Sequence, residues 1–191
     1  MQSLLDRYNQ VGLLNLLSES TPAEVQLSTE YEAQVQYLGP PHTVKYVAYD
    51  VNAVTKGNNF GVLQAYSRER GRDLEAFQLF CQDLTLDTPI SLQQGIFRVN
   101  CIDCLDRTNL MQSFLVKQAL SSFALQFGID INNLWEKYLQ RLWADNGDTL
   151  SKLYTGTAAL KSDITRGGVR SALGMLADAK KSGTLLLLPC R

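Results

Sequence analysis

One stretch near the middle of the chain, residues 98–109 (RVNCIDCLDRTN), constrains the fold more than any other. The β-rich residues 95–100 predict a short strand that opens at a glycine. Residues after the stretch fall at helical spacing and are largely apolar on one side, which predicts a helix: Leu110, Met111, Phe114, Leu115, Gln118, Ala119, Ser122 and Phe123. The sequence therefore predicts a strand, a tight loop and a helix in succession.

The spacing of Cys101 and Arg107 suits phosphoryl transfer. Five residues in a tight loop bring the thiol and the guanidinium around one tetrahedral anion, with backbone N–H groups pointing inward. The positive field at the start of the following helix favours a thiolate, so we expect the pKa of Cys101 to lie below its free value of about 8.5. Arg107 is predicted to grip two phosphoryl oxygens, and Thr108 to hydrogen-bond the sulfur. This predicts a cysteine-dependent phosphatase that forms a cysteinyl-phosphate and needs no metal or other cofactor.

The remaining loop residues receive roles around the same anion. Asp103 is predicted to be the general acid or to orient the attacking water, the alternative being a carboxylate that bonds loop amides or Arg98. Cys104 is predicted to be a reversible disulfide partner that protects Cys101 from over-oxidation. The residues expected to surround the phosphate are Ile102, Cys104, Leu105, Asp106 and Asn109.

Cys101 and Cys104 also form a C-x-x-C pair, which is typical of redox enzymes and of zinc sites. The only histidine, His42, stands beside prolines far from the pair, and the sequence has no second C-x-x-C. Zinc is therefore disfavoured and no metal ligands are assigned. A dithiol redox enzyme would leave Arg107 and Thr108 without a role. A reactive thiolate also indicates a reducing, cytosolic setting for the protein.

The twelve-residue stretch closely resembles the signature R-x-N-C-x-D-C-L-D-R-T-N of the Sac-domain phosphoinositide phosphatases. A second segment, residues 143–161, resembles the downstream family block W-x-x-N-G-D-x-I-S-x-x-Y-x-G-T-x-A-L-K. The two blocks cover roughly the second half of the chain, and the first ninety residues match loosely, through a segment that ends in Tyr49-Asp50. Ala158 stands where the family often has glycine, and residues 167–170 (GGVR) replace a basic run.

The resemblance implies an enzyme that removes a monoester phosphate from an inositol lipid such as phosphatidylinositol 4-phosphate. A protein phosphatase or a soluble inositol-phosphate phosphatase is a close variant. The alternative from another class is a truncated phosphoinositide-binding or scaffold fragment with negligible turnover. Lys161 and Arg166 are expected to form a cationic wall for the inositol phosphates or to be ordinary solvated charges. Asp145 and Asp148 belong to the second block, where Asn146-Gly147 is predicted to be a turn and Asp148 a helix N-cap.

Sac domains are considerably longer than this chain, so we expect residues 1–181 to be the catalytic part of a Sac domain without its N-terminal subdomain, and residues 182–191 to be a tail. The net charge of −1 and the lack of a basic stripe argue against a nucleic-acid partner. The sequence has no run of about 20 apolar residues, so membrane contact is expected to be peripheral. The resemblance implies a phosphoinositide head group as partner, on the cytosolic face of the endoplasmic reticulum, Golgi or endosomes; protein partners are left open.

The other segments favour an α/β fold with a small central sheet flanked by helices. Residues 21–24 are predicted to be a capping box with proline at the first helical position, and the helix is expected to end at Gly39-Pro40-Pro41. Residues 44–49 alternate as a strand. Residues 61–84 look helical, with a break at Gly71 and with buried positions at Leu74, Phe77, Phe80 and Cys81. Residues 133–143 predict another amphipathic helix.

Overall fold

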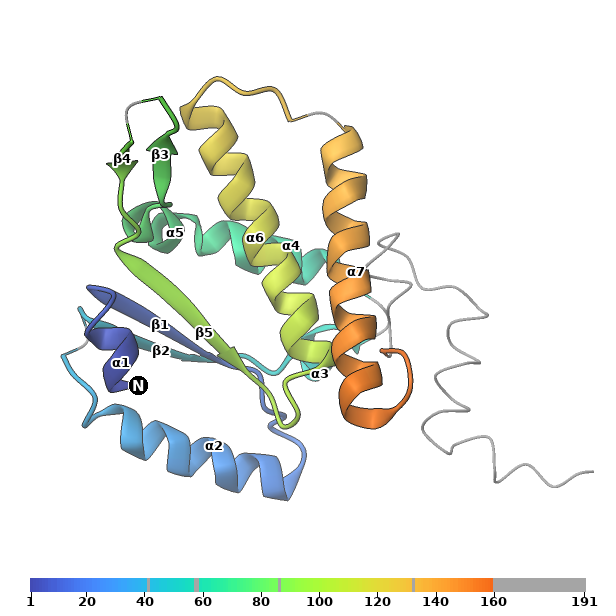
Figure 1. Ribbon diagram of the computed structural model, residues 1–191. Coiled ribbons are helices and arrows are strands. Elements are labelled where there is room, and N and C mark those ends of the chain that lie inside the picture. The colour runs from blue at the N-terminus through green and yellow to red at the C-terminus, as the bar shows by residue number, and fades with distance from the viewer. Residues whose placement is uncertain (41, 57–58, 86, 132, 160–191) are drawn as a thin grey trace, which may run out of the picture.

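A computed structural model describes residues 1–40, 42–56, 59–85, 87–131 and 133–159. Lys161, Arg166, the stretch 167–170 and the predicted tail lie outside the described residues. The α/β class is confirmed, because a small parallel sheet is flanked by helices (Figure 1).

Three parallel strands form the main sheet in the order β2-β1-β5. Their bounds are Gln10–Asn15 for β1, Val44–Ala48 for β2 and Gly95–Asn100 for β5. The strands predicted at residues 44–49 and 95–100 are thus confirmed. The central strand β1 was not predicted, because it is almost wholly buried and its apolar run does not alternate. A separate antiparallel hairpin pairs β3 (Cys81–Asp83) with β4 (Thr88–Ser91).

Helices cover both faces of the sheet. In Figure 1, α1 and α2 lie below the sheet, α4, α5 and α6 lie above it, and α7 lies to the right of α6. The helices are α1 (Gln2–Leu5), α2 (Pro22–Val35), α3 (Val51–Val54), α4 (Gly61–Glu69), α5 (Gly71–Phe77), α6 (Asp106–Gln126) and α7 (Asn133–Thr155). The helix α7 packs on α6 and forms an outer layer.

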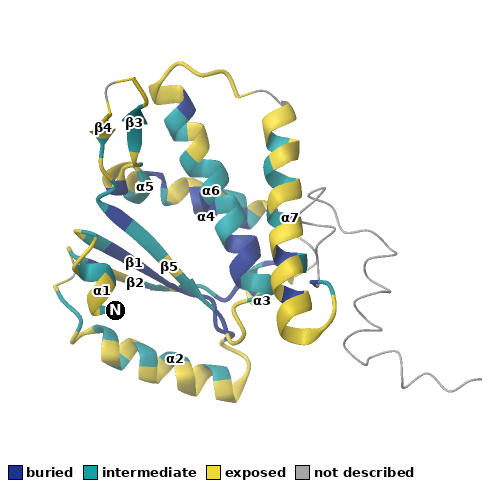
Figure 2. Cartoon of the chain, in the orientation of Figure 1, coloured by how far each residue is buried: buried dark blue, intermediate teal, exposed yellow. Residues whose placement is uncertain are grey.

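The core has two parts because side chains of β1 point to opposite faces in turn. Figure 2 shows buried residues along β1 and near the start of α6. Val11 and Leu13 face α1 and α2. Leu14 faces α4 and α6, and the buried core on that side contains Leu14, Leu16, Val51, Phe60, Leu63, Tyr66, Cys101, Leu110, Met111 and Leu115. Cys101 therefore belongs to the main core of the protein.

The single helical segment expected at residues 61–84 is partly wrong. The break at Gly71 is confirmed, but the helix ends at Phe77 and β3 begins at Cys81. Phe77 is buried against Phe97, with ring centroids 4.9 Å apart, whereas Phe80 is exposed. The helix ends because Gln78, its C-cap, has a φ of 54°, outside the helical range.

Two predictions about helix ends are wrong. The start of α2 has proline at its first position as expected, but Thr21 makes no side-chain capping bond, and the Glu24 carboxylate accepts from the N–H of Ser18 instead. The helix α7 does not turn at residues 146–147 and continues to Thr155. Asp148 is therefore not an N-cap, and its carboxylate accepts a hydrogen bond from the N–H of Ala159.

Candidate active site

The predicted loop lies at the carboxyl edge of the parallel sheet, where ligands of open α/β sheets usually bind. Leu16 follows β1 at this edge, Asp50 comes soon after β2, and Cys101 follows β5 directly. Asn15 and Asn100 are register partners at the ends of β1 and β5. The Asn100 side chain donates a 2.9 Å hydrogen bond to Asn15, so the two strand ends that carry the site are tied together.

Asn15 is a site-supporting residue that the sequence analysis missed. Its buried side chain donates to Ser28 Oγ at 2.7 Å and to the Tyr46 hydroxyl at 3.0 Å. These bonds join β1 to α2 and to β2. An asparagine inside an otherwise apolar run was the available signal, because a buried polar group requires hydrogen-bond partners.

Cys101 is 5% exposed and its sulfur has two polar neighbours. Thr108 Oγ1 donates to Sγ at 3.3 Å, which is the contact expected of it. The thiol donates to Asp103 Oδ1 at 3.4 Å, and the same carboxylate oxygen accepts from the N–H of Leu105 at 3.1 Å. Asp103 thus contacts both the sulfur and the loop backbone.

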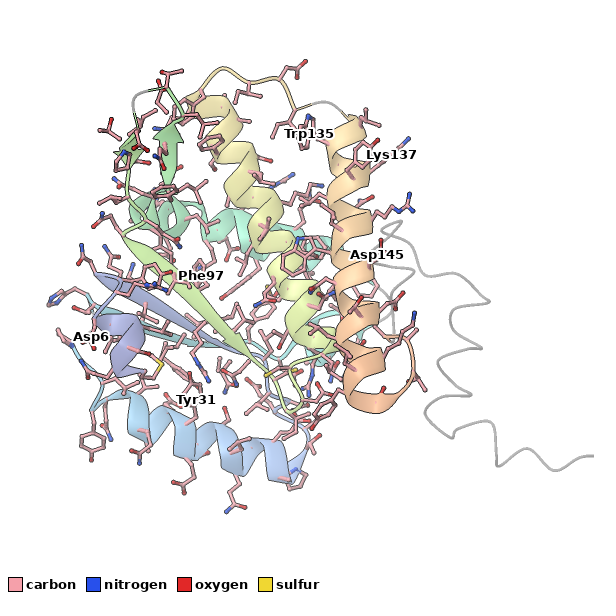
Figure 3. The ribbon with its side chains drawn as sticks, viewed as in Figure 1. Asp6, Tyr31, Phe97, Trp135, Lys137 and Asp145 are labelled. Carbon is pink, nitrogen blue, oxygen red and sulfur yellow. The ribbon has the colours of Figure 1, made fainter. Side chains whose placement is uncertain are left out.

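The alternative partner of Asp103, Arg98, lies elsewhere. Arg98 donates to the Tyr31 hydroxyl at 3.1 Å, on the α2 side of the sheet. Figure 3 shows Tyr31 on α2 pointing toward the sheet. The side chain of Arg98 therefore holds α2 against β5.

The pKa of the Cys101 thiol is raised, contrary to the expected lowering. Burial is the largest cause, because it disfavours the thiolate. The Thr108 hydrogen bond and the charge of Arg107 act in the opposite direction, and the nearby Asp103 carboxylate adds to the rise. The rise in this pKa caused by burial in the main core is therefore larger than the lowering caused by Thr108 and Arg107.

Arg107 lies in the first turn of α6 and is held by two acceptors. Its Nη1 donates to the Leu16 carbonyl at 3.1 Å and to Glu24 Oε2 at 2.7 Å. The two charged side chains are only 11% and 14% exposed. Burial acts to raise the pKa of Glu24, but the hydrogen bonds from Arg107 and from the Ser18 N–H outweigh burial, so this pKa is lowered. The capping box predicted for Glu24 did not include this ion pair with Arg107.

The loop itself is open to solvent on one side. Ile102, Asp103 and Cys104 are exposed, while Leu105 and Asp106 are half-buried. Cys104 has a φ of 56°, a left-handed conformation that is uncommon for residues other than glycine, and its thiol donates to the Cys101 carbonyl at 3.4 Å. Backbone strain of this kind is concentrated at functional sites.

Asn109 faces α7 instead of the loop opening. Its amide donates to the Trp143 carbonyl at 2.9 Å and accepts from Asn146 at 2.8 Å. A Cβ at Gly147 would lie 2.7 Å from Asn109 Nδ2, so this glycine allows the close approach of α7. The second sequence block thus packs against the helix that carries the loop.

Asp50 is a second buried acid that the sequence analysis did not assign. One carboxylate oxygen accepts from Ser18 Oγ at 3.0 Å and from the Glu19 N–H at 2.8 Å, and the other accepts from the Ala53 N–H. Burial acts to raise the pKa of Asp50, but these hydrogen bonds prevail and the pKa is lowered. A polar residue straight after a strand-like run was the signal for it.

Two features of other site classes are absent from the described part of the chain. Within residues 1–40, 42–56, 59–85, 87–131 and 133–159, no three or more His, Cys, Asp or Glu side chains gather as a metal-binding group. In the same ranges, no helix combines the length and the apolar character needed to cross a bilayer.

Fold and site together define an α/β protein whose cysteine- and arginine-bearing loop lies between the end of a parallel strand and the start of a long helix. Residues 1–56 match the family model of the SacI homology domain. The chain is 33% identical over 170 residues to Phosphatidylinositol-3-phosphatase SAC1 of Drosophila melanogaster, which covers 84% of this chain and 28% of that protein. These matches place the chain in the Sac family.

Two further relatives support membership of the Sac family. Polyphosphatidylinositol phosphatase INP53 of Saccharomyces cerevisiae is 33% identical over 187 residues, which covers 93% of this chain and 17% of that protein. Phosphatidylinositol-3-phosphatase SAC1-B of Danio rerio is 34% identical over 183 residues, which covers 92% of this chain and 30% of that protein. The similarity therefore extends well into the first ninety residues, where the sequence motifs matched only loosely. The chain spans less than a third of the length of these relatives.

Proposed function

We propose that this chain carries the catalytic site of a phosphoinositide phosphatase, which hydrolyses a phosphomonoester of an inositol lipid through a cysteinyl-phosphate. The observation that carries the proposal is the position of Cys101 Sγ, hydrogen-bonded to Thr108 and within the field of Arg107 at the start of α6. The names of the relatives, phosphatidylinositol phosphatases, support an inositol lipid as the substrate class.

In the first proposed step, the Cys101 thiol passes its proton to Asp103, its hydrogen-bond acceptor at 3.4 Å. The thiolate attacks phosphorus, an S–P bond forms and the P–O bond to the inositol oxygen breaks. Protonated Asp103 gives its proton to the departing oxygen, so one carboxylate serves as base and then as acid. The guanidinium of Arg107 and the N–H groups of the loop offset the charge on the phosphoryl oxygens.

In the second proposed step, water attacks the cysteinyl-phosphate. Asp103 takes a proton from the water, the S–P bond breaks and inorganic phosphate is released. The hydroxyl of Thr108 stabilises the departing sulfur through the 3.3 Å hydrogen bond that the structure contains. Ile102, Cys104, Leu105 and Asp106 are proposed to supply the backbone that surrounds the phosphate, with Asn109 fixing the helix behind it.

We also propose that the phosphoinositide head group is presented at a membrane surface, on the cytosolic face of the endomembranes. Lys161 and Arg166 are proposed to meet the inositol phosphates. Binding to vesicles that contain phosphatidylinositol 4-phosphate, compared with vesicles of phosphatidylcholine alone, tests this part. Equal binding to both kinds of vesicle contradicts it.

The central test is phosphate release from a panel of phosphoinositides in vesicles. We expect wild type to release phosphate, Cys101→Ser to release none, and Cys81→Ser, a cysteine on β3 outside the site, to match wild type. Acid quenching of wild type with labelled lipid should trap phosphate on Cys101. Release that survives Cys101→Ser overturns the nucleophile, and release that stops with a chelator overturns the metal-free mechanism.

A second candidate function is phosphoinositide binding without turnover. The raised pKa of Cys101 favours it, because a protonated thiol is a poor nucleophile. The same vesicle panel separates the two functions. Binding to phosphoinositide vesicles with no release of phosphate at any pH between 5 and about 9 supports the binding function, since the higher pH values raise the thiolate fraction.

A further inference from the structure

We propose that Glu24 is the positioning residue for Arg107, holding its guanidinium so that one edge faces the phosphate loop. The inference rests on the proposed function, because it concerns the same phosphate site. It assigns a role to a residue of α2, which is 83 positions away from Arg107 in the sequence.

The hydrogen bonds of Arg107 restrict the orientation of its guanidinium. A guanidinium has five N–H donors in a rigid plane, two of them on Nη1. Nη1 donates to Glu24 Oε2 at 2.7 Å and to the Leu16 carbonyl at 3.1 Å. Two acceptors on one nitrogen fix the orientation of the whole plane. The Nε and Nη2 donors then form the edge that matches two oxygens of a phosphate.

Glu24 is itself held in place. The oxygen that accepts from Arg107, Oε2, also accepts from the Ser18 N–H at 2.8 Å. Ser18 in turn donates through its hydroxyl to Asp50, whose carboxylate follows β2. A continuous set of hydrogen bonds thus runs from the end of β2, through the β1–α2 connection, to the guanidinium beside Cys101.

The hydrogen bonds from Ser18 and Arg107 both end on Glu24 Oε2. Substitutions can therefore separate the effect of the side chain's length from the effect of its charge. Glutamine at position 24 keeps an oxygen that can accept from both donors but removes the charge. Aspartate keeps the charge but is one methylene shorter. Positioning therefore predicts that Glu24→Gln is tolerated and Glu24→Asp is not, whereas a role of charge alone predicts the reverse order.

The test is calorimetric titration of the whole chain with tungstate, an oxyanion probe of the phosphate loop. We expect Glu24→Ala to weaken tungstate binding about tenfold or more and Glu24→Asp about fivefold, while Glu24→Gln stays within about threefold of wild type. Glu30→Gln, an exposed glutamate on the same helix, is the matched control and should bind as wild type does. Thermal unfolding of each variant identifies any that does not fold. If Glu24→Ala does not fold, the comparison of Glu24→Asp with Glu24→Gln tests the inference.

Equal tungstate affinity in wild type, Glu24→Ala and Glu24→Asp overturns the inference, as does a loss with Gln that exceeds the loss with Asp. Absence of tungstate binding by folded wild type overturns it too. The proposed function fails by a different result: tungstate binding that depends on Glu24 as described, with no phosphate released from any phosphoinositide. That outcome retains Glu24 as the residue that positions an anion-binding arginine.

Discussion

The helices α6 and α7 lie side by side, but their two ends are packed in different ways. At the loop end, the Asn109 side chain bonds to Trp143 and Asn146, and Gly147 removes the Cβ that would separate the helices. At the far end, large apolar side chains are exposed, among them Leu125 and Trp135, and a groove of about 610 Å³ lies between the helices. Figure 3 shows Trp135 near the N-terminal end of α7.

This difference indicates what the second sequence block does. The residues that resemble the family pattern, Trp143, Asn146 and Gly147, all lie at the loop end. They contact α6 within the first turns that follow Cys101, not the thiol itself. We infer that this block holds the helix that carries Arg107 and Thr108 through these contacts with Asn109.

The largest expected effect compares one substitution at the two ends of α6. Leu110→Ala, near the loop end, removes a buried side chain and should lower the free energy of unfolding by about 2–5 kcal/mol. Leu125→Ala, at an 85% exposed position, should change it by less than about 0.5 kcal/mol. Urea unfolding measures both. Similar losses at the two positions would remove the distinction between the ends.

The next largest effect is expected from loss of the asparagine bridge, the hydrogen bonds that join Asn109 to Trp143 and Asn146. Asn109→Ala leaves the Trp143 carbonyl and the Asn146 amide without their partner, which should cost about 1–3 kcal/mol of unfolding free energy. A double-mutant cycle with Asn146→Ala should show coupling, because the two amides are bonded directly. Gln126→Ala, an exposed amide at the other end of α6, is the control. If the losses of unfolding free energy from Asn109→Ala and Asn146→Ala add fully in the double variant, the two side chains are not coupled and the prediction is wrong.

A smaller effect is expected from Gly147→Ala, with a sign opposite to the usual one. Alanine normally stabilises a helix interior by about 1 kcal/mol relative to glycine. Here the new Cβ would displace Asn109, and overpacking costs about 1–3 kcal/mol, so we expect a net loss of roughly 1 kcal/mol. In an Asn109→Ala background the same change should become stabilising. A gain in stability in both backgrounds would contradict the close approach.

The smallest expected effect is a pH dependence of stability from Asp50. Its folded pKa lies below the unfolded one, so its carboxylate stabilises the fold above the unfolded pKa of about 3.9 and loses that contribution as pH falls through the folded pKa. Asp50→Asn should therefore be less stable than wild type at pH 7, with the difference shrinking below about pH 4. Urea midpoints at pH 7 and at about pH 3 measure it.

Glu136→Gln is the control for this pH dependence, because Glu136 pairs with Lys117 nearer the surface at the far end of the helix pair. Its difference from wild type should be small at both pH values. A gap between Asp50→Asn and wild type that is the same at pH 7 and pH 3 would contradict the role given to the Asp50 carboxylate.

The parts of the fold that follow from local pattern were predictable. The strand at residues 95–100, the loop and the start of α6 depend on spacing within a short stretch, and the strand at residues 44–49 depends on alternation. The buried strand β1 has no alternation to detect. Turn chemistry at Asn146-Gly147 indicated a turn, yet the helix continues because packing on Asn109 overrides the local preference.

The candidate site divides in the same way. The residue types of the loop and the Thr108–Cys101 hydrogen bond could be anticipated, since they lie within eight positions of each other. The Glu24 ion pair, the Asn15 bonds and the effect of burial on the pKa of Cys101 depend on the sheet that brings distant segments together. Single-sequence spacing contains no information about those contacts.

The hydrogen bonds around the loop join residues that are far apart in the chain: Arg107 to Leu16 across 91 positions, Asn100 to Asn15 across 85 and Arg107 to Glu24 across 83. Contacts of such long range form only after a large loop has closed, which makes them slow. During synthesis, Asn15, Leu16 and Glu24 leave the ribosome well before Asn100 and Arg107, their partners in these bonds. The loop between β5 and α6 therefore acquires these long-range hydrogen bonds late in folding, after the sheet has formed.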